Sequence, residues 1–417
     1  MGWDLNSFPI NQHSCILFMK LHQNILSSVI ISLKKIFLER AYADDIVRNL
    51  LQSNPKWGSR DRRFIASSIY SIVRWWKRYQ YIAETTEQDE ACFEKVLSVY
   101  LYETYGNDLE TPLPIAIDDS TYKEQVAKLA LIRSVKESIP DWMDELCVNE
   151  LGEEVWQNEL SILNKEADVF IRVNTLKGNP KQAIDALQKE GIEAHSFGAY
   201  PETLKLAERK PLQRLASFLK GIYEIQDAGS QAIAHYLNPV PGARIIDACA
   251  GAGGKSLHIA ALMKNKGQIV SMDIEAPKLK ELERRATRAG VDIIKTKAIT
   301  NGTIASLKNS ADYVLLDVPC SGIGVLRRNP DDKWKLSKEC IDNLVNIQQR
   351  IIQEYSMMVK SGGVLVYATC SILPSENDKQ INAFLAVNKQ FKLEKKQTVY
   401  PSQGGDGYFM ARLIKRV

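Results

Sequence analysis

Cysteine is scarce in this chain, and its cysteines do not form the patterns of a metal site or a disulfide framework. The 417 residues contain 7 cysteines, an odd number, and none stands in a C-x-x-C pair. This excludes zinc ribbons, redox pairs and iron–sulfur spacings, and also the scaffold of a small disulfide-rich protein. Free thiols at this density favour a reducing compartment. We therefore expect a cytoplasmic protein that holds no metal.

Long hydrophobic runs are also absent. No stretch reaches the roughly 18 apolar residues that a membrane helix needs, and charged residues break the apolar stretches near the start. Residues 1–18 show no clear periodicity, so we interpret them as an extension outside the core, with Met19 as an alternative start. We expect no contact with a membrane.

The chain has no large excess of charge of either sign. The chain has 54 basic and 50 acidic residues, which gives a net charge of +4. With 45% hydrophobic and 25% charged residues, the composition is typical of a globular protein and excludes a disordered chain. The charge permits a polyanionic partner without requiring one. We expect a monomer.

The hydrophobic pattern divides the chain into three parts. Residues 19–140 repeat apolar positions at helical spacing and predict a helical domain. Residues 141–240 predict a small α+β region, with a strand at 169–173. From 241 to 417, short apolar strands alternate with helices, which is typical of a Rossmann-like α/β domain with a parallel sheet. The expected strands are 244–247, 268–273, 293–296, 313–317 and 363–368.

The segment 73–79 of the helical part interleaves bases with aromatic residues. One interpretation is an RNA-contacting surface with stacking platforms. The other is an amphipathic helix whose tryptophans are buried and whose bases are solvated.

A glycine-rich turn follows the first strand of the α/β part. Glycines at such a turn let backbone amides approach a ligand from the start of a helix. The candidate ligand-binding residues of this turn are Cys249, Ala250, Gly251, Ala252, Gly253, Gly254 and Lys255.

Three kinds of ligand compete for this turn. A P-loop needs glycine where Cys249 stands, and a dinucleotide fingerprint needs glycine where Ser256 stands. S-adenosylmethionine remains, and Asp273 at the end of the next strand is expected to accept its ribose hydroxyls. A tight turn without a ligand and a nicotinamide dehydrogenase stay open as alternatives.

Two cysteines follow strand ends in the same part of the chain. Cys320 follows the strand that ends at Asp317, and Cys370 follows the strand 363–368. Ligands of an open parallel sheet bind beyond the carboxyl ends of its strands. We therefore expect both thiols, Asp273 and Asp317 to face the glycine turn. Buried structural cysteines are the alternative.

A cysteine beside a methyl donor suits methylation of a pyrimidine. Carbon 5 of cytosine is a poor nucleophile, and a thiolate that adds to carbon 6 makes it enamine-like. The base must leave its stack to be reached. Asp317 would then hydrogen-bond the ring nitrogen or the amino group. The sequence Asp-Val-Pro-Cys at 317–320 argues against amino-group methyltransferases, which usually carry Asp/Asn-Pro-Pro-aromatic there.

These motifs resemble the RNA (cytosine-5)-methyltransferases of the Nop/Sun type. The resemblance implies that Cys370 is the nucleophile, that Cys320 assists product release, and that S-adenosylmethionine is the methyl donor. The helical part resembles, more loosely, the NusB-like RNA-binding domain of the ribosomal-RNA members. Ribosomal RNA is the expected substrate and transfer RNA the alternative. The matching segments are RVNTLK (172–177), QDAGSQ (226–231), DACAGAGGKS (247–256), DVPCSGIGVLRRNPDDKW (317–334), YATCSILPSEN (367–377) and GDGYFMA (405–411).

The chain departs from the family pattern in two places. Gly251 and Ala252 replace an Ala-Pro pair, and the segment 299–301 lacks the acid that commonly lies near the adenine, so no adenine contact is assigned. A non-catalytic RNA-binding factor with the same fold is the competing function. Candidate phosphate contacts, or else solvated surface bases, are Arg172, Arg327, Arg328 and Lys333.

Overall fold

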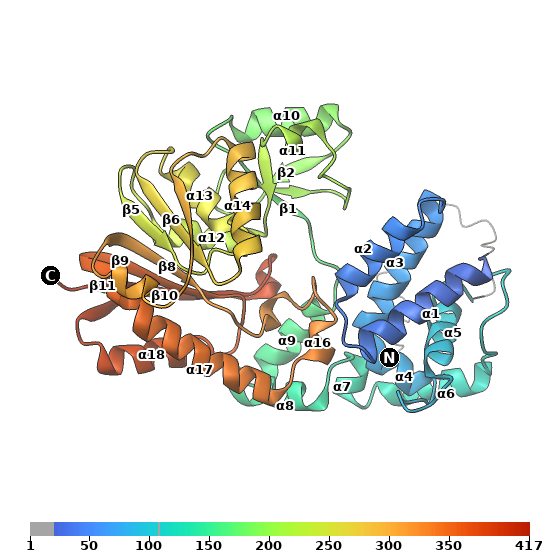
Figure 1. Cartoon of the computed structure of the whole chain (residues 1–417). Coiled ribbons are helices and arrows are strands. Elements are labelled where there is room, and N and C mark those ends of the chain that lie inside the picture. The colour runs from blue at the N-terminus through green and yellow to red at the C-terminus, as the bar shows by residue number, and fades with distance from the viewer. Residues whose placement is uncertain (1–20, 107–108) are drawn as a thin grey trace. The chain divides into compact units, whose positions relative to one another are not determined.

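The computed structural model describes residues 21–106 and 109–417 (Figure 1). These residues form two compact units, one that runs to Asp141 and includes Lys333–Lys335, and one that comprises Trp142–Asp332 and Leu336–Val417. The proposed extension at 1–18 lies outside the described residues. Within the described part of the chain, no helix is both long and apolar enough to cross a membrane.

The first unit is helical because its apolar residues repeat every three to four positions. In α3 this spacing buries Phe64, Ile65, Ile69 and Ile72 along one face, and the neighbouring helices supply matching apolar faces to a common core. The helices are α1 (Gln23–Phe37), α2 (Ala43–Ser53), α3 (Ser59–Arg74), α4 (Trp76–Ile82), α5 (Cys92–Tyr105), α6 (Asp119–Leu129) and α7 (Arg133–Lys136).

The aromatic and basic segment at the end of α3 belongs to this core. Trp76 is 1% exposed and stacks on Phe37, with ring centroids 3.8 Å apart. Arg78 pairs with Glu103, and Lys77 Nζ donates to Asp141 Oδ1 over 2.7 Å. The amphipathic-helix interpretation is therefore the better one, although these two bases form internal pairs and not a solvated face.

Helix α16 (Asp332–Lys335) inserts a lysine into the same unit. Lys333 is 1% exposed, and its Nζ donates to the carbonyl oxygens of Arg74 and Ser138 over 2.9 and 3.0 Å. Burial, with the charge of Arg74, lowers the pKa of Lys333 well below its usual value. The carbonyls at a helix end need such donors. This corrects the expectation that Lys333 contacts RNA phosphate, because its amine faces protein carbonyls.

We expect Lys333→Ala to destabilise the end of α3 by about 2–4 kcal/mol, because two carbonyls lose their donor and a cavity remains. Hydrogen–deuterium exchange on the full chain measures this as faster exchange in α3. Lys338→Ala, at an exposed position, is the matched control. Equal protection of α3 in both variants would contradict the capping role.

The second unit begins with two helices and a small antiparallel sheet. The strand order is β2-β3-β1-β4, and β1 at its centre is buried along its whole length. Helix α10 covers the sheet through Ala183 and Leu187. The elements are α8 (Asp141–Leu151), α9 (Glu153–Leu163), β1 (Phe170–Val173), α10 (Pro180–Lys189), β2 (Ala194–Ser196), β3 (Thr203–Leu206), α11 (Ala216–Leu219) and β4 (Tyr223–Ile225).

The larger sheet of this unit has seven strands in the order β10-β11-β9-β8-β5-β6-β7. The strands from β9 to β7 are parallel, and β11 pairs antiparallel with both β9 and β10. The predicted Rossmann-like α/β domain, after a helical part and a small α+β region, is confirmed. The strands are β5 (Arg244–Asp247), β6 (Gln268–Asp273), β7 (Ile294–Ala298), β8 (Ala311–Asp317), β9 (Val359–Thr369), β10 (Phe391–Val399) and β11 (Tyr408–Lys415).

Helices cover both faces of this sheet (Figure 1). Side chains alternate between faces along a strand, so Ile245 packs with α12, α13 and α14, whereas Ile246 packs with α17 and α18. The remaining elements are α12 (Ala228–Leu237), α13 (Gly254–Leu262), α14 (Ala276–Ala289), α15 (Thr303–Ser306), η2 (Ile323–Val325), α17 (Lys338–Tyr355), η3 (Ser356–Met358), α18 (Asp378–Val387) and η4 (Pro401–Gln403).

Candidate active site

The parallel strands of the large sheet end in the residues predicted for the site. Strands β5, β6 and β8 end at Asp247, Asp273 and Asp317, and Cys370 directly follows β9. Because these strands are parallel, their carboxyl ends meet at one edge of the sheet. The structure thus brings the glycine turn, the acids and the cysteine motifs to the same edge.

The glycine turn between β5 and α13 has a packed side and an open side. Gly251 and Gly253 have φ values of +51° and +84°, a region that side chains other than glycine rarely adopt. A Cβ on Gly253 would lie 2.3 Å from Leu282, whereas a Cβ on Gly251 would meet nothing within 4 Å. Gly253 therefore permits packing on α14, and Gly251 leaves room for a ligand at the start of α13.

Asp273 fixes this turn to the end of β6. Its Oδ2 accepts the amide of Gly251 over 2.8 Å, and its Oδ1 accepts the amide of Glu275 over 2.8 Å. A carboxylate offers about four acceptor positions. Asp273 thus has capacity for hydroxyl donors of a ligand that lies over the turn.

Lys255 and Asp317 form an ion pair across the site. Lys255 Nζ lies 2.5 Å from Asp317 Oδ2, and the two side chains are 14% and 25% exposed. Burial alone would lower the pKa of Lys255, but the charge and hydrogen bond of Asp317 raise it above its usual value. The amine therefore stays charged, and Cys370 is among the groups that act on it electrostatically.

Burial and nearby acids keep the cysteine of the glycine turn protonated. Burial, followed by the charges of Asp247, Asp317 and Asp273, raises the pKa of Cys249 well above its usual value. Burial also raises the pKa of Asp247 to about 6, and Ser256 Oγ donates to its carboxylate over 2.6 Å. Cys249 is thus a poor candidate for a nucleophile.

The two remaining site cysteines lie against each other. Their Sγ atoms are 3.2 Å apart, and the amide of Cys370 donates to Cys320 Sγ over 3.3 Å. The hydrogen bond with Cys370, together with burial, raises the pKa of Cys320 well above its usual value. The Cys320 thiol therefore keeps its proton more firmly than an ordinary cysteine does.

The arginines predicted to contact RNA have partners inside the protein. Arg172 is 3% exposed and donates to the carbonyl of Gly254 over 2.8 Å. Arg327 is 4% exposed and donates to Asp406 over 2.8 Å. This burial corrects the expectation of phosphate contacts for Arg172 and Arg327. Arg328 also bonds to Asp406, but its side chain is 30% exposed, and its contact with RNA stays a prediction.

Two family models match the second unit. Residues 234–414 match the 16S rRNA methyltransferase RsmB/F, and residues 139–213 match the ferredoxin-like domain of RsmF/B-like methyltransferases. The ribosomal RNA small subunit methyltransferase B of Photorhabdus laumondii is 34% identical over 270 residues, which cover 63% of each chain. The chain belongs to the RsmB/F family. This confirms the resemblance drawn from its motifs.

The matches with RsmB/F relatives and with solved structures cover different shares of each chain. The chain spans about three fifths of the length of the curated relatives it matches. The crystal structure of PH0851 shares the fold over 95% of this chain and 100% of its own, with a TM-score of 0.78 and 24% identity. NSun6 from Pyrococcus horikoshii, solved with SFG, covers 67% of this chain and 99% of its own, with a TM-score of 0.62 and 24% identity.

A buried glutamate that the sequence analysis did not single out joins the two cysteine loops. Glu376 is fully buried, and its carboxylate accepts the amide and the hydroxyl of Ser321 over 2.8 and 2.5 Å. It also accepts the amide group of Gln348 over 2.9 Å. Because Ser321 follows Cys320 and Glu376 follows Cys370 by six residues, this carboxylate fixes one loop against the other. Its place in the YATCSILPSEN segment was the available signal.

We expect Glu376→Gln to separate the two sulfurs, because the new amide group would face donors of Ser321 and Gln348. With diamide as the oxidant, the wild-type chain should form a Cys320–Cys370 disulfide. The variant should form this disulfide at about one tenth of the wild-type rate or slower, since misplaced groups react slowly.

Peptide mapping by mass spectrometry under non-reducing conditions measures this disulfide. Glu354→Gln, at an exposed position of α17, is the control and should behave as the wild type. An unchanged rate in Glu376→Gln would show that another contact sets the spacing of the sulfurs.

Proposed function

We propose that this chain transfers a methyl group from S-adenosylmethionine to carbon 5 of a cytidine in ribosomal RNA, through a covalent adduct with Cys370. The observation that carries this proposal is the pair of sulfurs 3.2 Å apart at the glycine-turn edge of the sheet. The match of residues 234–414 to a 16S rRNA methyltransferase family supports the RNA class. Transfer RNA is the alternative substrate.

The residues of the glycine turn fit S-adenosylmethionine. The open side of Gly251 admits a ligand, and the first amides of α13 suit a carboxylate. Asp273 would accept the ribose hydroxyls, and residues 249–255 would line the rest of the molecule. When bound, this cofactor supplies a methyl group on a positively charged sulfonium.

Cys370 would activate the cytosine ring. Its sulfur forms a bond to carbon 6, the electrons of the carbon 5–carbon 6 double bond move into the ring, and carbon 5 becomes nucleophilic. Lys255 holds Asp317 in place, so that this carboxylate can accept a hydrogen bond from the amino group of the base. The same ammonium stabilises an anionic sulfur nearby.

Cys320 would complete the reaction. After methylation, carbon 5 loses its proton, the double bond re-forms, and the bond from carbon 6 to the Cys370 sulfur breaks. Cys320 retains a proton and lies 3.2 Å from that sulfur. It can donate its proton to the departing sulfur and take up the proton of carbon 5.

We assign RNA binding to the helical unit on its NusB-like resemblance, and to Arg328 in the second unit. The chemistry needs both sulfurs reduced, which suits a cytoplasmic enzyme. We propose that it acts as a monomer.

We expect Asp273→Ala to weaken binding of S-adenosylmethionine by at least about tenfold, because hydrogen bonds to a charged group contribute about 1.5–3 kcal/mol each. Isothermal titration calorimetry measures the affinity. Asp292→Ala, at an exposed position before β7, is the control. Equal affinities would contradict the placement of the ribose.

Substitution of each cysteine should give a different product. Cys370→Ala leaves carbon 5 unactivated, so we expect neither methyl transfer nor a covalent complex. Cys320→Ala permits attack and methylation but impairs release. That variant should accumulate a denaturant-resistant protein–RNA adduct, seen as a shifted band on a denaturing gel.

The control for these variants is Cys340→Ala, which removes an exposed thiol and should leave turnover unchanged. An adduct from Cys370→Ala and none from Cys320→Ala would exchange the two roles. Full methyl-transfer activity in both variants would contradict the covalent mechanism. Inactivity of the wild type on bulk RNA would favour a non-catalytic RNA-binding factor.

A further inference from the structure

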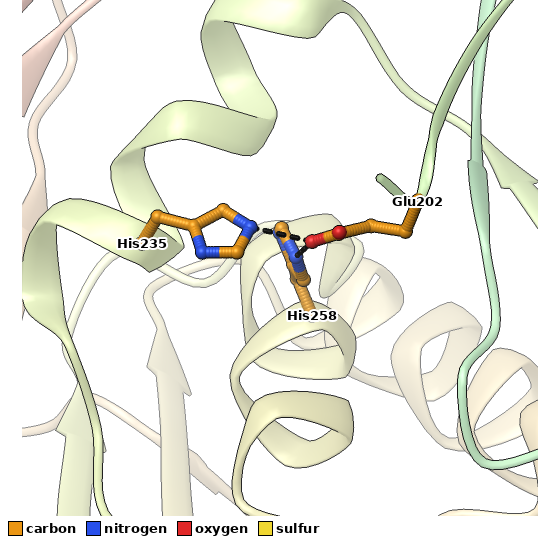
Figure 2. A group of neighbouring side chains, drawn as sticks. All are labelled: Glu202, His235 and His258. Atoms are coloured by element: carbon orange, nitrogen blue, oxygen red, sulfur yellow. Dashed lines mark hydrogen bonds and ion pairs between the residues drawn. The ribbon is translucent and has the colours of Figure 1, made fainter. Parts of the chain in front are cut away.

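Two histidines and a glutamate converge on one point of the second unit (Figure 2). Glu202 directly precedes β3, His235 lies in α12 and His258 lies in α13. Figure 2 shows both imidazole rings directed at the same carboxylate. The Nε2 atoms of His235 and His258 lie 2.5 and 3.1 Å from Glu202 Oε1.

The cluster is largely enclosed by the protein. The side chains of His258, Glu202 and His235 are 1%, 9% and 22% exposed. Both histidines contact the same oxygen of Glu202, so the three donor groups already face one another.

We propose that Glu202, His235 and His258 bind a divalent transition-metal ion of the zinc class. One carboxylate oxygen and two imidazole nitrogens form a donor set that Zn²⁺ readily accepts. The three donor atoms lie within 4.8 Å of one another. Bonds of about 2.0–2.2 Å to a tetrahedral ion place donors about 3–3.5 Å apart, so the cluster needs only small side-chain shifts.

The protons of the cluster can adjust to such an ion. A histidine that binds through Nε2 carries its proton on Nδ1. In the described structure Nε2 of His258 faces the carboxylate and its Nδ1 has no hydrogen-bond partner, so no acceptor or donor at Nδ1 opposes a move of the proton to that nitrogen. The partial exposure of His235 gives an ion a path from solvent and leaves a fourth position for water.

The ion would join the small sheet to the helices of the large one. Glu202 lies next to β3, while α13 carries His258 and begins at the glycine turn. We therefore assign the site a structural role that holds α13 in place. The expectation of no metal rested on cysteine spacing alone, and these residues lie 33 and 23 positions apart in no recognised motif.

The test uses the full chain with Cys320, Cys340 and Cys370 changed to serine, because thiols bind zinc themselves. After treatment with a chelator, calorimetric titration with Zn²⁺ should show one ion per chain and thermal melting should shift upward. Titration with Co²⁺ should give visible d–d bands without a sulfur-to-metal charge-transfer band. His235→Ala and Glu202→Gln should each weaken Zn²⁺ binding by at least tenfold.

The exposed pair His195 and Glu193, whose Nε2 and Oε1 lie 3.1 Å apart, supplies the matched control. His195→Ala should leave Zn²⁺ affinity unchanged. Circular dichroism checks folding, and His235→Ala is the variant least prone to disturb it because His235 is the most exposed of the three. Two outcomes would show a hydrogen-bonded cluster only. One is absence of Zn²⁺ binding to the serine-substituted chain, and the other is an affinity of both cluster variants equal to that of the serine-substituted chain. None of these readouts depends on methyl transfer.

Discussion

The chemistry proposed for this chain depends on one buried carboxylate. Glu376 is fully buried, and an isolated charge in such a place is costly. Three donors from Ser321 and Gln348 compensate for this cost. Because Ser321 follows Cys320 in sequence, the contacts that satisfy the charge also hold one cysteine against the other. The requirement to satisfy a buried charge thus sets the spacing of the two sulfurs.

The charged groups around the site distinguish its sulfurs from one another. Burial, together with the charges of three nearby acids, raises the pKa of Cys249 and keeps its proton in place. Cys320 keeps its proton through the contact with Cys370. Lys255, which Asp317 holds charged, supplies positive charge on the side of Cys370. Position relative to these charges, and not the residue type, assigns a different task to each thiol.

Sequence patterns predicted the edge of the sheet well and the long-range pairs poorly. The rule that parallel strands end at one edge placed Asp273, Asp317 and Cys370 together without coordinates. The same patterns treated Arg327 as a surface base, because its partner Asp406 lies 79 residues away. Strand β10 was missed because five of its nine side chains are exposed and four of those are charged, which gives little apolar alternation. From sequence alone, a basic side chain is predicted to be exposed to solvent unless its distant acidic partner is known.

The backbone of the proposed nucleophile is fixed where three motifs meet. The amide of Gly324 donates to the carbonyl of Cys370 over 3.1 Å, and the amide of Gly407 donates to the carbonyl of Gly324 over 2.7 Å. A Cβ on Gly324 would lie 2.4 Å from the Gly407 oxygen, so only glycine permits this approach. Asp406, beside Gly407, is in turn bound by Arg327 and Arg328.

These contacts join segments that lie far apart in sequence. The arginines follow Cys320 within one segment, Asp406 belongs to GDGYFMA, and Asp227, which accepts from Arg328 over 2.8 Å, belongs to QDAGSQ. Each segment supplies either a charge or a close backbone approach that another segment requires. A change in one of these segments would leave a buried charge unpaired. The resulting rearrangement would shift the backbone of Cys370, because Gly324 contacts both Cys370 and Gly407. The position of the nucleophile is therefore a property of the whole set and not of its own loop.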